Sequence, residues 1–320
     1  MVIAGSCWST SEFRVPTSEF RVPSSEFRLL TTVLYGSCWY VYSREGGKTG
    51  VHTMSWSTLL LVVAHSGDRA GVPAGMPSVL ANLPLHSKAH GRRSDGRTFV
   101  LHRLSDRPHA FLLKGFLSAE ECDALIESAK RSGFEAAETT GKTNARRHCE
   151  VALLTPSQER VLASIQSDAA RVLLSSEALR TEGGGVEALN VLHYQPGGEY
   201  TLHYDAMNNP RILTILYYLN GKGETWFPLA DSPQRVARAF ADPNGVVSHA
   251  STLDPATDGL RVKPTGAGDA LAFFNFDETG EPDQWALHAG LEVVPTEEKW
   301  LGTHFFNHPK LCAGYESYVL

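Results

Sequence analysis

The sequence predicts an α+β fold with a double-stranded β-helix (jelly-roll) core and flanking N-terminal helices. Two observations lead to this prediction. Apolar residues recur at helical spacing in two segments between residues 118 and 174, and short segments rich in β-branched and aromatic residues begin at residue 186. Helices followed by a run of short strands are typical of a helical layer packed on a double sheet. The 320 residues suffice for one or two domains with a sizeable core.

The first part of the chain differs in composition from the rest. The tetrapeptide Ser-Glu-Phe-Arg recurs three times between residues 11 and 28, and the proline within the repeat disfavours a helix. We therefore expect residues 1–95 to be a low-complexity, disordered region with short repeats, and residues 96–320 to form the folded domain. Residues 57–67 weakly resemble the apolar core of a secretory signal but lack a basic segment before it, so a short apolar patch is the favoured interpretation. Residues 66–107 have the composition of a linker.

Two helices are expected next. Ser118 and Glu121 have the spacing of a capping box, and Gly133 is a typical helix end. A second helix is expected to begin at Thr155, with Pro156 in its tolerant first turn.

The remaining segments alternate between strand-forming residues and turn residues. The predicted strands are Val186–Tyr194, Tyr200–Tyr204, Ile212–Leu219, Thr225–Pro228, Ala270–Asn275, Leu291–Val294 and Trp300–Phe306. The interval 231–262 is expected to be a long irregular loop of the kind that forms lids or binding loops.

Composition excludes several classes of protein. The net charge of −6 provides no strong basic field for nucleic acid or an anionic membrane. The longest apolar run, Leu59–Ala64, is far shorter than the ~20 residues of a membrane-spanning helix. Five cysteines do not make a disulfide scaffold, and the disulfide status of Cys122, Cys149 and Cys312 stays open, as does the oligomeric state.

Three residues have the types and spacing of a metal site. His203 and Asp205 lie two apart in a predicted strand, so their side chains share one face. His288, before another predicted strand, is the candidate third ligand. Two histidines and one carboxylate with open positions form the facial triad of non-haem Fe(II) oxygenases, although catalytic zinc sites also use this set. Lys299, eleven residues after His288, would suit the distal carboxylate of 2-oxoglutarate and favours iron.

Several segments carry a family resemblance, in chain order. They are LHYQPGGEY at 192–200 followed by HYD at 203–205, RILTILYYLN at 211–220, GETWFP at 223–228, VKP, GDAL and FF between 262 and 274, LHAG at 287–290, and KW at 299–300. Over residues 108–309 the chain thereby resembles the catalytic domain of the prolyl 4-hydroxylase family of Fe(II)/2-oxoglutarate-dependent dioxygenases.

The resemblance implies roles for individual residues. His203, Asp205 and His288 would bind Fe(II), and Lys299 would bind the distal carboxylate of the cosubstrate 2-oxoglutarate. These four residues would form the catalytic set. Tyr194 and Thr214 would add hydroxyl donors to the cosubstrate. O2 would be the second cosubstrate, and L-ascorbate would reduce iron that has been oxidised in unproductive turnovers.

The resemblance also implies a reaction and a partner. The expected reaction is hydroxylation of peptidyl proline at C4 with release of succinate and CO2. The proline-containing peptide or protein would enter a groove partly covered by residues 139–147 and 231–262. Two alternatives are a related oxygenase acting on another peptide residue or a free amino acid, and a non-catalytic peptide-binding relative. The resemblance suggests the endoplasmic reticulum as the compartment. The sequence adds no support of its own, since it contains no clean signal peptide.

Overall fold

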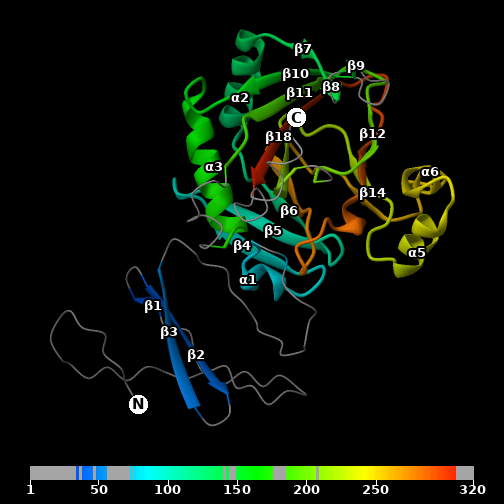
Figure 1. Cartoon of the computed structure of the whole chain (residues 1–320). Coiled ribbons are helices and arrows are strands. Elements are labelled where there is room, and N and C mark those ends of the chain that lie inside the picture. The colour runs from blue at the N-terminus through cyan, green and yellow to red at the C-terminus, as the bar shows by residue number, and fades with distance from the viewer. Residues whose placement is uncertain are drawn as a thin grey trace. The chain divides into compact units, whose positions relative to one another are not determined.

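The computed structural model describes residues 34–35, 38–45, 48–55, 73, 75–139, 142–143, 149–175, 185–206 and 209–307 (Figure 1). The chain divides into two compact units, Met1–Leu59 and Leu60–Leu320. The Ser-Glu-Phe-Arg repeats and the signal-like segment at 57–67 lie outside the described residues.

The first unit contains a three-stranded antiparallel sheet. Its strands are β1 (Leu34–Tyr35), β2 (Cys38–Glu45) and β3 (Lys48–Ser55). Glu45 pairs with Lys48 across a two-residue connection, so β2 and β3 form a hairpin. These three strands lie within the region that the sequence predicts to be low-complexity and disordered. The signal was present in the sequence, since Gly46-Gly47 separates two segments rich in aromatic and β-branched residues.

The second unit contains the remaining helices and strands that the structure describes. The helices are α1 (Ser78–Ala81), α2 (Ala119–Ser132), α3 (Arg160–Leu173), α5 (Pro233–Ala241), α6 (Val246–Ala250) and the 3-10 helix η1 (Gln284–Ala286). The strands are β4 (Lys88–Arg92), β5 (Thr98–Ser105), β6 (Ala110–Lys114), β7 (Glu135–Ala136), β8 (Glu138–Thr139), β9 (Lys142–Thr143), β10 (Glu150–Leu154), β11 (Leu189–Tyr194), β12 (Tyr200–His203), β13 (Arg211–Tyr218), β14 (Thr225–Phe227), β15 (Leu260–Val262), β16 (Asp269–Phe274), β17 (His288–Gly290) and β18 (Lys299–Asn307).

The strands from β11 to β18 form a jelly roll, as the sequence predicts. The major sheet has the order β4-β5-β6-β16-β13-β18-β11-β10-β7, and the minor sheet has the order β12-β17-β14-β15. Consecutive strands of the jelly roll therefore alternate between the sheets for much of its length, which is the topology of a double-stranded β-helix. Residues from the inner faces of both sheets line one pocket.

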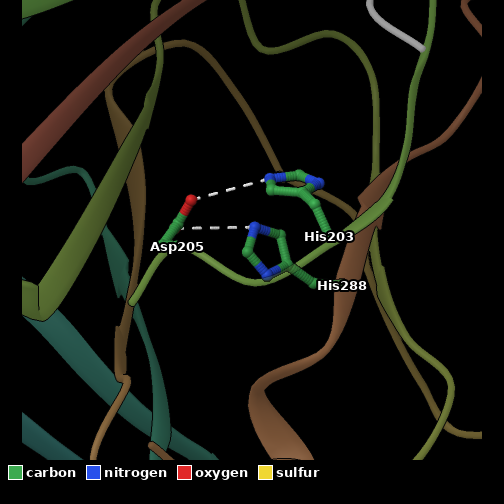
Figure 2. Close-up of side chains that lie close together, drawn as sticks. All are labelled: His203, Asp205 and His288. Atoms are coloured by element: carbon green, nitrogen blue, oxygen red, sulfur yellow. Dashed lines mark ion pairs between the residues drawn. The ribbon is translucent and has the colours of Figure 1, made fainter. Parts of the chain in front are cut away.

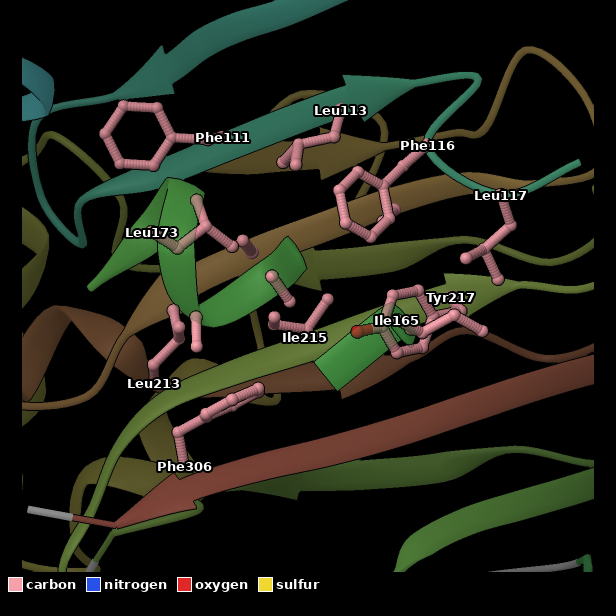
Figure 3. Packing of buried hydrophobic residues seen from close by; sticks show 14 of the residues in the cluster. Phe111, Leu113, Phe116, Leu117, Ile165, Leu173, Leu213, Ile215, Tyr217 and Phe306 are labelled. Carbon is pink, nitrogen blue, oxygen red and sulfur yellow. The ribbon is translucent and has the colours of Figure 1, made fainter. Parts of the chain in front are cut away.

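Helices α2 and α3 pack against the outer face of the major sheet. Figure 3 shows Ile165 and Leu173 of α3 within this cluster. Strand β13 is buried on both faces, because Leu213, Ile215 and Tyr217 join the cluster under the helices while Leu216 and Tyr218 join a second cluster inside the jelly roll. This arrangement fixes which residues of β13 face the pocket.

The two predicted helices are present, with one difference in position. Helix α2 has the predicted capping box, in which Ser118 and Glu121 bond to each other's backbone amides, and it ends at Gly133. Helix α3 begins at Arg160 rather than in the segment that starts with Thr155. The Gln158 side chain accepts a hydrogen bond from the Thr155 amide, so residues 155–158 form a turn before the helix.

The folded unit also extends further toward the N-terminus than the predicted boundary at residue 96. That boundary falls in the turn between β4 and β5, which pair with each other in the major sheet. The Arg93 side chain is 1% exposed and forms ion pairs with Glu121 of α2 and Asp168 of α3. The composition of residues 66–107 is typical of a linker, because arginine is usually exposed in folded proteins. In the structure, however, Arg93 and Arg103 are both buried.

Two further predictions are corrected. The interval 231–262 contains α5, α6 and β15 rather than an irregular loop, and its apolar residues pack with Trp226 and Leu287 of the minor-sheet region. Among the residues predicted as a strand at 291–294, Val293 instead exchanges backbone hydrogen bonds with Gly197 and Gly198, and the preceding strand β17 ends at Gly290. No helix among the described residues is both long and apolar enough to cross a membrane.

Candidate metal and cosubstrate site

Two histidines face each other across neighbouring strands of the minor sheet. His203 of β12 and His288 of β17 are directly paired, and their ring centroids lie 4.2 Å apart. Asp205 follows just past the end of β12, and its two carboxylate oxygens each lie 3.6 Å from the Nε2 atom of one histidine (Figure 2). One ligand atom from each of the three residues lies within 4.8 Å of the others. The structure thus brings together the three residues that the sequence predicts as metal ligands.

Hydrogen bonds outside the cluster orient both rings. His203 Nδ1 lies 2.8 Å from the Thr201 carbonyl oxygen, and His288 Nδ1 lies 2.9 Å from the Ala286 carbonyl oxygen. A carbonyl only accepts, so each Nδ1 carries the donated proton and a neutral ring keeps an Nε2 lone pair toward Asp205. Burial, followed by the neighbouring His203, lowers the pKa of His288 to about 4, so its imidazole is neutral at physiological pH.

The Asp205 carboxyl is ionised in the same environment. Burial alone would raise its pKa, but the hydrogen bond that the Thr214 hydroxyl donates favours the ionised form and lowers the pKa. A carboxylate and two imidazole lone pairs therefore converge on one small volume. Such a set is electrostatically unfavourable without a cation, and it matches the donors of a facial triad that leaves coordination positions open.

Lys299 lies deeper in the same pocket. It is directly opposite Tyr194 in the β11–β18 pair, and its Nζ atom lies 5.1 Å from the centroid of the Tyr194 ring. The residue is only 1% exposed, and burial lowers its pKa from 10.5 to about 8. No carboxylate among the described residues forms an ion pair with Nζ. A buried ammonium without a counter-ion favours an anionic ligand.

The path of the Lys299 side chain depends on Gly223. A Cβ atom at Gly223 would lie 2.3 Å from Lys299 Cδ, and the backbone there has φ +79°, which disfavours residues with a side chain. The glycine of the sequence GETWFP therefore leaves the space through which the lysine stem reaches the pocket.

The pocket between the sheets has a volume of about 330 Å³, within the range of small-molecule sites. Its lining includes the three clustered residues and Lys299, together with Tyr194, Tyr200, Thr225 and Gly290. Other lining residues near Arg211 are polar or aromatic: Asn190, Asn209, Thr303 and Phe305. None of the lining residues comes from the interval 231–262, so the structure does not support the expected cover over the groove from that segment. The segment 139–147 lies mostly outside the described residues.

The two predicted hydroxyl donors occupy different environments. Tyr194 lines the pocket beside Lys299, as expected for a residue that contacts the cosubstrate. Thr214 is not among the lining residues, is fully buried, and donates its hydroxyl proton to Asp205. Sequence reasoning missed Thr225, which lines the pocket from β14 and shares a 2.9 Å hydrogen bond with Tyr218. Its place beside Gly223 in the GETWFP segment was the available signal.

Comparisons with known proteins place this pocket in a class. Residues 189–307 match the model of the 2OG-Fe(II) oxygenase superfamily. The chain is 33% identical over 232 residues to Probable prolyl 4-hydroxylase 6 of Arabidopsis thaliana, covering 65% of this chain and 74% of that protein. It is 30% identical over 221 residues to Prolyl 4-hydroxylase 2 of the same plant, covering 64% of this chain and 69% of that protein. Among solved structures, the viral collagen prolyl hydroxylase from Paramecium Bursaria Chlorella virus-1 aligns at 25% identity and a TM-score of 0.45, covering 64% of this chain and 98% of that one.

The matched region contains every strand of the jelly roll and all the residues of the cluster. The protein is therefore a 2-oxoglutarate- and Fe(II)-dependent dioxygenase. Within that class, the chain belongs to the prolyl 4-hydroxylase family, and the expected family resemblance is confirmed. Fe(II), 2-oxoglutarate and O2 are the cofactor and cosubstrates that this membership implies.

Proposed function

We propose that this protein hydroxylates peptidyl proline at C4, with Fe(II) held by His203, Asp205 and His288. The observation that carries the proposal is the convergence of two Nε2 lone pairs and one carboxylate within 4.8 Å. The donor set fits Fe(II), and a metal bound there would offset the repulsion between these electron-rich atoms. Zinc would fit the same three donors, and the family relationship favours iron.

The bound Fe(II), with 2-oxoglutarate and O2, supplies the oxidising chemistry that hydroxylates an unactivated C–H bond and releases succinate and CO2. The residues of this chain bind, orient and enclose the reactants. The Thr201 and Ala286 carbonyls hold the two imidazole rings in one tautomer and one orientation, so that no rearrangement is needed when the metal binds.

Lys299 is proposed to bind the distal carboxylate of 2-oxoglutarate. Its ammonium is buried and lacks a counter-ion among the described residues, so a carboxylate there would gain a strong charge-assisted hydrogen bond. The Tyr194 and Thr225 hydroxyls line the same part of the pocket and are proposed to orient that carboxylate further. This arrangement leaves the other end of the cosubstrate free to meet the metal.

The choice of proline as substrate is supported by the relatives named prolyl 4-hydroxylases. Ascorbate is proposed as the reductant that restores iron after turnovers without substrate. The endoplasmic reticulum stays a prediction from the resemblance, and reporter fusions that start at Met1 and at Met54 would test it.

The test is an assay of the full chain with Fe(II), 2-oxoglutarate, ascorbate and a proline-rich peptide. We expect succinate formation and addition of one oxygen atom to proline, assigned to C4 by comparison with authentic 4-hydroxyproline. His203→Ala should abolish both products. The matched control is His90→Ala, because His90 lies on an exposed face of β4 away from the cluster.

Two outcomes would count against the proposal. Succinate formation that persists in His203→Ala would place the chemistry elsewhere. Succinate formation that depends on His203 without any hydroxyproline, across a panel of proline-rich peptides, would reject proline as the substrate while retaining the oxygenase.

A further inference from the structure

Two buried hydrogen bonds in series lead to Asp205, one of the three proposed metal ligands, from residues outside the pocket. Asn275 Nδ2 donates to Thr214 Oγ1 over 2.8 Å, and Thr214 Oγ1 donates to Asp205 Oδ2 over 2.8 Å. Asn275 is 1% exposed and Thr214 is fully buried. Neither residue lines the pocket, so neither contacts a molecule bound there.

The direction of donation is set by the chemistry of the groups. A threonine hydroxyl has one proton, and the Asn275 amide donates to the hydroxyl oxygen. The hydroxyl proton is therefore committed to Asp205. Removing the amide of Asn275 would leave the hydroxyl free to rotate, and removing the hydroxyl would leave the carboxylate without its only fixed neutral donor in the described cluster.

The backbone holds the far end of this chain in place. The backbone N–H of Asn275 donates to the Ile212 carbonyl, and the backbone carbonyl of Asn275 accepts from the backbone N–H of Asp283. Thr214 lies on β13, whose paired strands β16 and β18 fix its position in the major sheet. The hydrogen bonds thus connect the rigid major sheet to Asp205, which lies past the end of β12 in a segment outside the minor-sheet ladder.

We propose that Thr214 and Asn275 are positioning residues that hold the Asp205 carboxylate in its metal-binding orientation. Both Asp205 oxygens already face an imidazole at 3.6 Å, and the carboxylate can rotate about its terminal torsion unless something restrains it. The Thr214 hydroxyl engages Oδ2 and restrains that rotation. This inference rests on the proposed function, because it assigns a role toward the proposed metal.

The test measures Co(II) binding to the full chain in the presence of 2-oxoglutarate, using calorimetry and the visible absorption of bound Co(II). Thr214→Val removes the hydroxyl and keeps the shape, whereas Thr214→Ser keeps the hydroxyl. We expect Thr214→Val to weaken Co(II) binding roughly 10–100-fold, as loss of an outer hydrogen bond to a metal ligand does. It should also shift the Co(II) absorption bands, and Thr214→Ser should restore most of the affinity.

A purely structural role would not change the absorption bands. Wild-type affinity and spectrum in a folded Thr214→Val variant would overturn the proposal. If that variant does not fold, Asn275→Ala decides the matter, because it releases the Thr214 hydroxyl without touching Asp205. A several-fold loss of Co(II) affinity in Asn275→Ala supports the positioning role, and wild-type affinity overturns it. Absence of Co(II) binding to the wild-type chain would instead refute the proposed function.

Discussion

The two ends of the pocket differ in whether their polar side chains have partners in the protein. At the end with His203, Asp205 and His288, each side chain forms a hydrogen bond with a group outside the cluster: the histidines donate to backbone carbonyls, and Asp205 accepts from a hydroxyl. At the other end, Lys299 is more deeply buried than any of these three residues but has no ion pair with any described residue. The first end is organised before anything binds, and the second end carries an unbalanced positive charge.

This difference indicates what each end is built to bind. Converging lone pairs with fixed orientations favour a metal ion, which gains from preorganised ligands. A buried ammonium that burial has already shifted toward the neutral form favours a carboxylate, which restores the charged form. The two ends should therefore respond separately to mutation, and the following experiments test that separation.

The largest effect is expected from Asp205→Asn, which removes the charge of the metal end and keeps its shape. We expect Co(II) affinity to fall by at least about 100-fold, beyond the usual range for losing an outer hydrogen bond. Isothermal titration calorimetry measures this change, with His90→Ala as the control. Metal binding at wild-type affinity in Asp205→Asn would show that the carboxylate charge is not part of the site.

The metal end was also the part of the site that sequence reasoning located best. Residue types and the two-residue spacing identified His203 and Asp205, and the strand register then placed His288 opposite His203. The role of Thr214 could not be predicted in this way, because its partner Asn275 is distant in the chain and meets it only through the pairing of β13 and β16. Likewise, the composition around Arg93 did not indicate its two buried ion pairs, because their acidic partners come from α2 and α3, which are distant in the chain.

The next largest effect is expected at the opposite end, from Lys299→Met. Loss of a charge-assisted hydrogen bond should weaken 2-oxoglutarate binding to the metal-loaded protein roughly 10–100-fold, while Co(II) affinity stays unchanged. Without ligands, the variant should be more stable than the wild type by up to about 3 kcal/mol at pH 7, because a buried unbalanced charge has been removed. Calorimetry and denaturant unfolding measure the two quantities. Loss of metal binding in Lys299→Met would contradict the separation of the two ends.

A smaller effect is expected from pH, acting on the same lysine. Because burial lowers the pKa of Lys299 to about 8, the ammonium is present below that pH and is lost above it. The affinity for 2-oxoglutarate should therefore be constant up to about pH 8 and fall roughly tenfold by pH 9. The stability of the protein without 2-oxoglutarate should change in the opposite direction, and rise with pH. Between pH 8 and 10.5 the unfolded chain holds a proton on Lys299 that the folded chain has lost, so this lysine destabilises the fold less as the pH rises through that interval.

The control for the pH experiment is Lys299→Met. Titrations of the Ni(II)-loaded protein with 2-oxoglutarate between pH 7 and pH 9 should give a sloping dependence for the wild type and a flat one for the variant. Equal slopes in the two proteins would assign the pH dependence to a different group.

The smallest effect is expected from Gly290→Ala, which changes only the shape of the lysine end. A Cβ atom there would lie 3.5 Å from Lys299 Nζ and 3.7 Å from Tyr200 Cβ, which are ordinary contacts, so the apo fold should accept it. The added methyl group would occupy space beside Nζ that the cosubstrate carboxylate requires. We expect 2-oxoglutarate affinity to fall about fivefold, equivalent to about 1 kcal/mol, with Co(II) affinity and thermal stability unchanged. Gly266→Ala is the matched control, because a Cβ atom there meets no neighbour within 4 Å. Wild-type 2-oxoglutarate affinity in Gly290→Ala would mean that the carboxylate binds away from this side of Lys299, since a methyl group at 3.5 Å cannot share the space with it.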